Sequence, residues 1–443
     1  MRISPWFVPL LSLVVVPPLS ATGGVADLVR AYVANHSVAN HAVPSFARQT
    51  GLACSSCHYQ FLTLTPFGRK FKLNGYTLSN QVLIEEKDST NGGKLGLSPV
   101  SMLSAMVTAG ITHTKNEVAG TQNDVAALPQ ELSGFLAGRI SPKVGLFSQF
   151  TYAGADGAFG IDNVDIRFAD KGTIGGSTEV VYGLTLNNNP TIQDLWNSTP
   201  GWGFPFIGSD AAPGAAAATK IEDGLGQNVL GLGGYGLFGN LVYAEFSVYR
   251  SALQGVSAPD ATTGAIKGVT PYWRLALQKD FDKQSVMVGT FGMHTSLFPE
   301  GSLSGPQDTY SDIGVDAQFE SRVGTGNLVV RGSWIHEKQT LDATFAAGGS
   351  ANNENTLKSL HVNASYYPKQ WLGLSGGYFD TRGTSDAGLY GGEPNTNGFI
   401  GEVDLNPWEN TRVGLQYTGY SSLDGSSDAS GNNTLFAFLW LVF

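Results

Sequence analysis

Residues 242–249 read Val-Tyr-Ala-Glu-Phe-Ser-Val-Tyr, and this stretch sets the pattern for most of the chain. Apolar side chains at even positions alternate with polar or amphipathic side chains at odd positions. A period of two places successive side chains on opposite faces of a β-strand, so the stretch predicts a strand with one apolar face. That face would be the core of a soluble sandwich or the lipid-facing surface of a membrane barrel. One strand alone does not decide between the two.

The alternation recurs from about residue 98 to the end of the chain, and the spacing of the segments favours the barrel. Gaps after odd-numbered strands are mostly long, such as 188–226 and 251–269, whereas gaps after even-numbered strands are short, such as 141–142. Short turns at one end and long loops at the other are typical of outer-membrane barrels. We therefore predict an all-β transmembrane barrel of about sixteen antiparallel strands over residues 98–443, in the bacterial outer membrane. The candidate strands are 99–113, 129–140, 143–152, 162–170, 177–187, 227–237, 240–250, 270–280, 284–296, 308–320, 326–340, 355–367, 370–381, 396–406, 410–420 and 433–443.

The end of the chain agrees with this prediction. Leu, Ala, Leu, Leu and Phe occupy every second position from Leu435 to Phe443. This ending resembles the C-terminal signal that is read during assembly of bacterial outer-membrane proteins. In a soluble sheet, a long apolar strand at a free terminus would be an aggregation hazard, so the ending also favours the membrane barrel.

The N-terminus and the composition indicate export from the cytoplasm. A positive start is followed by a short apolar stretch at 6–19 and by small residues before position 21, so we predict a signal peptide over residues 1–21. The chain has 57 glycines, 11% aromatic residues, only 14% charged residues and a net charge of -10. Soluble proteins carry about 25% charged residues. The acidic balance also argues against nucleic acid as a partner.

Residues 54–58 read Cys-Ser-Ser-Cys-His, and Cys54 and Cys57 are the only cysteines in the chain. Two thiols at this spacing can each bond one vinyl group of the same haem, and the adjacent histidine can reach the iron. The neighbouring His58 and the lack of other cysteines argue against a redox dithiol and against half of a zinc site. The sequence therefore predicts one covalent haem c on Cys54 and Cys57, with His58 as the proximal iron ligand.

A short helix is predicted directly after this motif. Thr65 fits an N-cap, Pro66 the first helical position and Gly75 a C-terminal glycine cap. Phe67 and Phe71 lie four residues apart on one helical face, where they would cover a haem face or form a small core. Four basic residues are placed to pair with the haem propionates or to form a solvated basic face: Arg48, Arg69, Lys70 and Lys72.

The residues around the motif resemble the N-terminal cytochrome segment of the fused outer-membrane cytochrome–porins, a group that includes the iron oxidases of iron-oxidising bacteria. The resemblance is strongest over 44–76, where the matching stretches read PSFARQTG at 44–51, CSSCH at 54–58, LTPFGR at 64–69, Phe-Lys at 71–72 and Gly-Tyr at 75–76. The layout also matches over the whole chain. It consists of the signal peptide, a one-haem cytochrome segment with its linker over 22–97, and the barrel over 98–443.

The resemblance implies an electron conduit in the outer membrane. An extracellular donor, with Fe(II) as the first candidate, would pass an electron through the haem to a periplasmic cytochrome or copper protein. The protein would then be an Fe(II):cytochrome oxidoreductase. A haem held outside the barrel could not reach across an apolar band about 25 Å tall, so we expect the segment to plug the lumen. Two alternatives stay open: a transport porin with a haem-bearing, redox-sensing plug, and outward electron transfer to an extracellular acceptor.

The sixth iron ligand has several candidates. Met102 and Met106 share the polar, lumen-facing parity of the strand predicted at 99–113, and a thioether ligand would raise the haem potential. We place Met106 first, with packing between segment and wall as the alternative role. His36 and His41 are the rivals, and ligation by two histidines would lower the potential. The remaining histidines are expected as lumen or rim residues: His113, His294, His336 and His361.

The long predicted external loops carry the candidate donor site. They contain a run rich in Trp, Pro and Gly at 196–205 and the acidic residues Asp194, Asp210, Glu222 and Asp223. Hard oxygen ligands would suit iron in passage, although acidic loops are also common on solvated surfaces.

Overall fold

The structure is a computed structural model that describes residues 43–79, 81, 84–85, 96–117, 124–155, 157–252, 264–299 and 302–443. These residues belong to one compact unit, Val38–Phe443. The predicted signal peptide and the candidate ligands His36 and His41 lie outside the described residues, as does the side chain of Asp223. Among the described residues, no helix is both long enough and apolar enough to cross a membrane.

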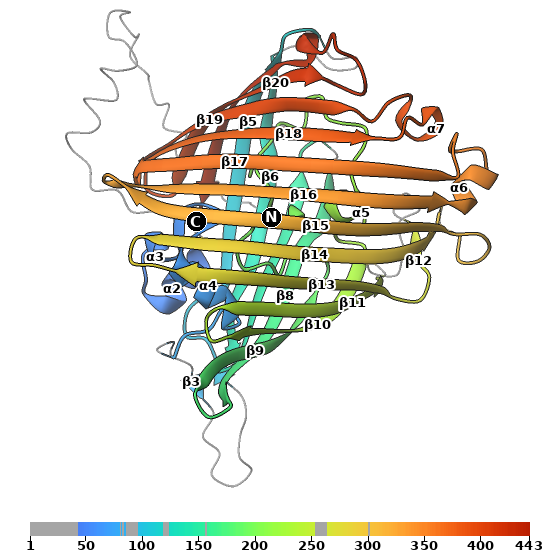
Figure 1. The fold of residues 1–443 in the computed structure, drawn as a ribbon. Helices are drawn as coiled ribbons and strands as arrows, with labels where there is room; N and C mark the ends of the chain where they lie inside the picture. Colours follow the sequence, from blue (N-terminus) through green and yellow to red (C-terminus); the bar gives the residue numbers. More distant parts are fainter. Residues whose placement is uncertain are drawn as a thin grey trace, which may run out of the picture. The chain divides into compact units, whose positions relative to one another are not determined.

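A closed antiparallel barrel forms most of the described chain (Figure 1). Sixteen long strands follow one another around the ring, and β21 pairs with β5 to close it. The two-residue strand β12 (Ala265–Ile266) pairs with one end of β14. The long strands agree one for one with those predicted from the alternation, so this prediction is confirmed. They are β5 (Leu103–Thr114), β6 (Val125–Ser141), β7 (Val144–Ala153), β8 (Ala158–Ile174), β9 (Thr178–Asn187), β10 (Val229–Phe238), β11 (Val242–Ser251), β13 (Thr270–Asp280), β14 (Gln284–Phe298), β15 (Asp308–Val323), β16 (Gly326–Leu341), β17 (Glu354–Lys369), β18 (Leu372–Gly383), β19 (Thr396–Trp408), β20 (Thr411–Ser422) and β21 (Thr434–Val442).

The two faces of the strands exclude the soluble sandwich. In β5 the even-numbered residues from Ser104 to Thr114 are buried, and they include serine and threonine side chains. On the other parity, Leu103 and Ile111 are 57% and 55% exposed. A soluble protein buries its apolar side chains and exposes its polar ones. The reversed arrangement is that of a membrane barrel with lipid outside and a polar lumen.

The connections show which end of the barrel faces which compartment. Residues 142–143 and 324–325 form short turns at one end, whereas residues 188–228 connect β9 and β10 at the other. The chain terminus lies at the short-turn end, where Ala105 N–H donates to the carbonyl of Phe443 (2.8 Å) and Phe443 N–H donates back (2.9 Å). In outer-membrane barrels the short turns are periplasmic and the long loops extracellular. The protein is therefore located in the bacterial outer membrane.

Residues 43–79, which we call the motif segment, contain three short helices and a small hairpin. They are α2 (Pro44–Thr50), α3 (Cys54–Cys57), β1 (His58–Gln60), β2 (Thr63–Leu64) and α4 (Pro66–Leu73). The predicted helix caps are confirmed. Gly68 N–H donates to Thr65 Oγ1 (3.1 Å) at the start of α4, and Gly75 follows its end with a left-handed φ of 66°. Glycine adopts this conformation without a Cβ clash.

The motif segment packs against inward-facing groups at the short-turn end of the barrel. Gln49 donates to the carbonyl of Ala137 on β6 (2.9 Å), and Tyr76 donates to Asp165 on β8 (2.7 Å). Arg69 forms an ion pair with Glu320 on β15, and both side chains are nearly fully buried. Because these three strands are spread around the ring, the segment lies within it.

Residues 188–228, which we call the lumen loop, also fold into the barrel. The prediction of an external loop here was wrong, since residues 190–199 are all buried. Buried polar contacts fix the loop, and they outweigh the tendency of an acidic loop to remain in solvent. An ion pair joins it to β13 through Asp194–Arg274. Hydrogen bonds join it to β15, β17 and β20 through Ser198–Asp316, Glu222–Ser359 and Ile207–Gln416. The loop therefore crosses the interior from one side to the other.

The remaining short elements lie in connections. They are β3 (Ile84–Glu85), which pairs with β4 (Gly96–Leu97), η1 (Pro200–Trp202) and α5 (Lys220–Asp223) in the lumen loop, α6 (Asp342–Ala346), α7 (Ala387–Tyr390) and η2 (Ser430–Asn432).

Candidate functional site

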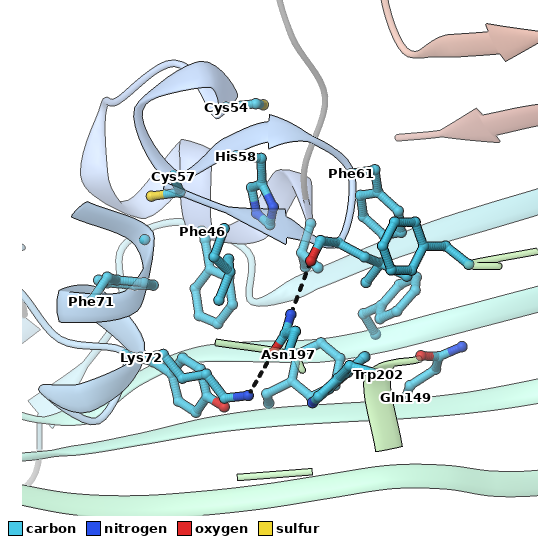
Figure 2. A pocket seen from close by; sticks show the side chains of 18 of the residues that line it. Phe46, Cys54, Cys57, His58, Phe61, Phe71, Lys72, Gln149, Asn197 and Trp202 are labelled. Carbon is cyan, nitrogen blue, oxygen red and sulfur yellow. Dashed lines mark hydrogen bonds between the residues drawn. The ribbon is translucent and has the colours of Figure 1, made fainter. Parts of the chain in front are cut away.

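A cavity of about 490 Å³ lies between the motif segment, the lumen loop and the inner faces of β5, β6, β7 and β21 (Figure 2). We call it the motif cavity. Cys54, Cys57 and His58 line it, and aromatic side chains form a large part of its wall. Cofactor sites are commonly apolar cavities in this range of volume. The aromatic wall is made by Phe46, Phe61, Phe67, Phe71, Tyr76, Phe135, Phe147, Trp202, Phe204, Phe206 and Trp440.

The two cysteines are the first and last residues of one short helix, and both line the motif cavity. Helix α3 spans Cys54–Cys57, and residues three apart on a helix are neighbours on its surface. The cysteines form no disulfide, although their spacing would suit a redox pair. Burial, with a smaller contribution from Cys54, raises the pKa of the Cys57 thiol to about 11. A raised pKa keeps the Cys57 thiol protonated, which does not suit a reactive thiolate.

His58 begins β1 and points into the motif cavity (Figure 2). Its ring lies 6.1 Å from that of Phe61, centre to centre. Burial lowers the pKa of His58 to about 4, so the imidazole is neutral, as a metal ligand must be. Its Nδ1 is buried and has no hydrogen-bond partner among the described residues. A neutral imidazole beside two thiols in an aromatic cavity fits a haem c.

Helix α4 and its N-cap residue hold the backbone of the Cys54–His58 motif in place. Thr65 donates from its backbone N–H to the carbonyl of Cys57 (2.9 Å) and from its hydroxyl to the carbonyl of Ser56 (2.7 Å). A Cβ on Gly68 would lie only 2.1 Å from the Cys57 carbonyl oxygen, so only glycine allows this approach. The Thr-Pro-Phe-Gly stretch at 65–68 therefore positions the motif as well as starting a helix.

Met106 lies across the motif cavity on β5. It is 3% exposed and lines the same cavity as His58. Met102 precedes β5, is only half-buried and is not part of the described cavity wall. The structure thus brings together His58 and one of the two predicted methionines, and ligation by Met106 stays a prediction. Phe71 is buried against Phe46 at 5.1 Å, centre to centre.

The basic residues of α4 do not form the solvated face that the sequence suggested. Arg69 and Lys72 are buried. The Lys72 ammonium donates to the carbonyls of Ile192 (2.7 Å) and Asp194 (2.6 Å) in the lumen loop. Burial, assisted by the nearby Arg167, lowers the pKa of Lys72 to about 7. These two charges attach the segment to loop and barrel, so they are not placed to pair with propionates. Only Arg48 and Lys70 remain exposed.

A second cavity, of about 360 Å³, lies on the other side of the lumen loop. We call it the loop-side chamber, and its barrel wall comes from β16 to β20. Thr381 and Tyr420 in this wall lie near the long-loop ends of their strands. His361, expected at the lumen or rim, lies here and contacts Glu222 (3.1 Å). Burial alone would raise the pKa of Glu222, but hydrogen bonds from His361, Ser359 and Thr219 lower it.

The predicted acidic donor site is not assembled. Asp194 is fully buried beside Arg274 and accepts hydrogen bonds from the backbone of Trp196 (3.1 Å) and Ser198 (2.8 Å). Asp210 is exposed. In the described parts of the chain, no three His, Cys, Asp or Glu side chains are grouped to hold a metal ion. The sequence did not predict that the lumen loop folds inward, because acidic residues in a long segment between strands are usually found on a solvated surface.

No protein-family model matches the chain, and no curated protein matches it. Among solved structures, the chain is similar to the anion-selective porin from Comamonas acidovorans, at 14% identity over 77% of this chain and 98% of that chain, with a TM-score of 0.47. It is also similar to Salmonella typhi OmpF in complex with daunomycin (13%, 77% and 97%, TM-score 0.44). In-vitro folded OmpT of Vibrio cholerae is a third (8%, 77% and 96%, TM-score 0.43). Similarity at this level supports no conclusion about activity.

Proposed function

We propose that this protein is an outer-membrane electron conduit in which the motif segment is a one-haem cytochrome that plugs the barrel. Cys54 and Cys57 would hold haem c covalently, with His58 and Met106 as its axial ligands. A bound haem c supplies reversible one-electron transfer. The observation that carries the proposal is the cavity inside the barrel that both cysteines, His58 and Met106 line together.

The residues that line the motif cavity would set the reduction potential of the proposed haem. Aromatic side chains line much of the cavity, and Trp202 of the lumen loop lies opposite the motif. An apolar shell and a thioether ligand both favour the reduced, less charged iron and so raise the potential. A high potential suits acceptance of an electron from Fe(II).

The location of the motif segment indicates from which side of the membrane each electron-transfer partner would approach. The motif segment lies at the short-turn end, which faces the periplasm, so a soluble cytochrome or copper protein would receive the electron there. The extracellular donor, for which Fe(II) is the first candidate, would arrive from the long-loop end. We propose Fe(II):cytochrome oxidoreductase as the resulting activity.

The filled interior favours this proposal over a transport porin. The motif segment contacts three separated strands, and the lumen loop is joined to four by hydrogen bonds and an ion pair. Buried ion pairs fix both elements, including Asp194–Arg274 with both side chains at 0% exposure. Opening a pore for solutes would require these buried ion pairs, and the hydrogen bonds beside them, to separate.

Intact cells under anaerobic conditions provide the test. Fe(II) added outside should reduce the haem of the wild-type protein, and a periplasmic oxidant should then reoxidise it. Cys57→Ala cells with the same amount of barrel in the outer membrane are the matched control and should show no such signal. Solute uptake through the wild-type barrel without Fe(II)-dependent haem reduction would support the transport porin instead. A strongly negative reduction potential would support outward electron transfer.

A further inference from the structure

The loop-side chamber contains a buried cation without a counter-ion. Arg331 projects from β16 and is 4% exposed. Its Nε donates to Gln318 (2.7 Å), and its guanidinium lies 5.9 Å from the ring centre of Phe206. Its Nη2 is buried and has no hydrogen-bond partner among the described residues. The chamber is the cavity that this side chain lines.

Four other buried arginines of the described barrel and motif segment pair with carboxylates, and the fifth, Arg139, donates to backbone carbonyls. Arg69 pairs with Glu320, Arg167 with Asp165, and Arg274 and Arg412 each contact two carboxylates. No ion pair to Arg331 is formed within the described parts of the chain. An unpaired charge in a buried site is costly, so the free side of this guanidinium is suited to a negative partner that the described side chains do not supply.

The only carboxylate in the described wall of the chamber does not meet this need. Glu222 already accepts hydrogen bonds from Ser359 (2.6 Å) and Thr219 (2.8 Å), and it contacts His361 (3.1 Å). The neighbouring wall offers further polar groups at Ser333 and Asn363. The chamber therefore combines a free guanidinium edge with a wall of polar and apolar side chains, in which the one described carboxylate, Glu222, is already paired with His361.

We infer that the loop-side chamber binds a small oxyanion, a carboxylate or a phosphate, through Arg331. A planar guanidinium matches both groups with paired hydrogen bonds. The volume of about 360 Å³ admits a small molecule. This inference goes beyond the proposed electron transfer and does not require the haem.

The position of the chamber connects it to the proposed function. Five residues of the lumen loop line both the chamber and the motif cavity: Asn197, Pro200, Gly203, Phe204 and Pro205. One stretch of chain thus separates the bound anion from the cavity of His58.

Calorimetric titration of the purified full-length protein in detergent tests the inference, with citrate and inorganic phosphate as probes. The wild type should bind at least one of them at a single site. Arg331→Gln should weaken that binding at least tenfold, and Arg331→Lys should retain part of it because the charge remains. Arg382→Gln is the matched control and should bind like the wild type, since Arg382 is 64% exposed and pairs with Asp380.

Two further measurements separate loss of anion binding from loss of the folded barrel. Heat-modifiable gel migration reports whether each variant forms the barrel. Ser333→Phe keeps Arg331 but fills the chamber, so it should also abolish binding. Preference for citrate or for phosphate identifies the oxyanion, and either supports the inference. Absence of binding to the wild type, or equal binding to folded Arg331→Gln, would overturn it. Covalent haem is quantified separately, so a failure here leaves the proposed function untouched.

Discussion

The ion pair between Arg69 and Glu320 offers a quantitative test of how the motif segment is held in the barrel. Their side chains are 5% and 3% exposed, so water screens them very little. Removing one partner of such a pair costs about 3–5 kcal/mol, mainly because the other charge stays buried. In Arg69→Gln, Glu320 would keep its hydrogen bond from Tyr59 (3.1 Å). We therefore expect a loss near the lower end, about 3 kcal/mol, which is roughly 100-fold in the opening equilibrium of the segment.

Native-state hydrogen exchange of the α4 backbone amides is the assay, because these amides exchange when the segment separates from the barrel wall. Arg69→Gln and Glu320→Gln should each speed their exchange roughly 100-fold. The double variant should lose less than the sum of the two, by about 2 kcal/mol, because it leaves no unpaired charge. Lys143→Gln is the control. It breaks a pair at the barrel turns whose side chains are 53% and 27% exposed, and should leave α4 unchanged.

Additive effects in the double variant, or exchange in Arg69→Gln as slow as in Lys143→Gln, would refute the reasoning. Either result would mean that the segment is held without this ion pair.

Three further outcomes are expected. Met106→Ala should remove a sulfur-to-iron absorption band and lower the reduction potential, whereas Met102→Ala should change neither; an unaltered potential in redox titrations of Met106→Ala would exclude this ligand. Gly68→Ala should reduce covalent haem on denaturing gels, because its Cβ would meet a motif carbonyl at 2.1 Å and such overpacking costs about 1–3 kcal/mol. Gly160→Ala, which meets nothing within 4 Å, should keep wild-type haem. Deleting Phe443 should lower the yield of heat-modifiable barrel, because it removes two hydrogen bonds that close the ring; an unchanged yield would count against a role in assembly.

The barrel could be predicted because its strands depend on local pattern. Each strand must present polar side chains to the lumen and apolar ones to lipid, so the period of two is present in every segment. The caps of α4 were equally accessible, since Thr65, Pro66 and Gly75 act on their immediate neighbours. Strand ends differ from the prediction by a few residues, where pairing extends beyond the alternating pattern.

The interior could not be predicted in the same way, because its contacts join residues far apart in the sequence. The buried Asp194 forms an ion pair with Arg274, and the buried Lys72 donates hydrogen bonds to carbonyls of the lumen loop. Read singly, each of these charged residues favours an exposed position. Only the folded barrel shows that their partners point into the same space. Arg331 gave no signal in the sequence for the same reason.

The absorption spectrum of the purified protein, mixed with Fe(II) without oxygen, decides whether this barrel carries a haem that accepts electrons from iron. We expect a c-type haem that stays bound under denaturing conditions and that changes from its oxidised to its reduced spectrum when Fe(II) is added. The Cys57→Ala variant, folded as the same barrel, should show little or no such signal. A well-folded wild-type barrel without covalent haem, or with haem that Fe(II) does not reduce, would contradict the account.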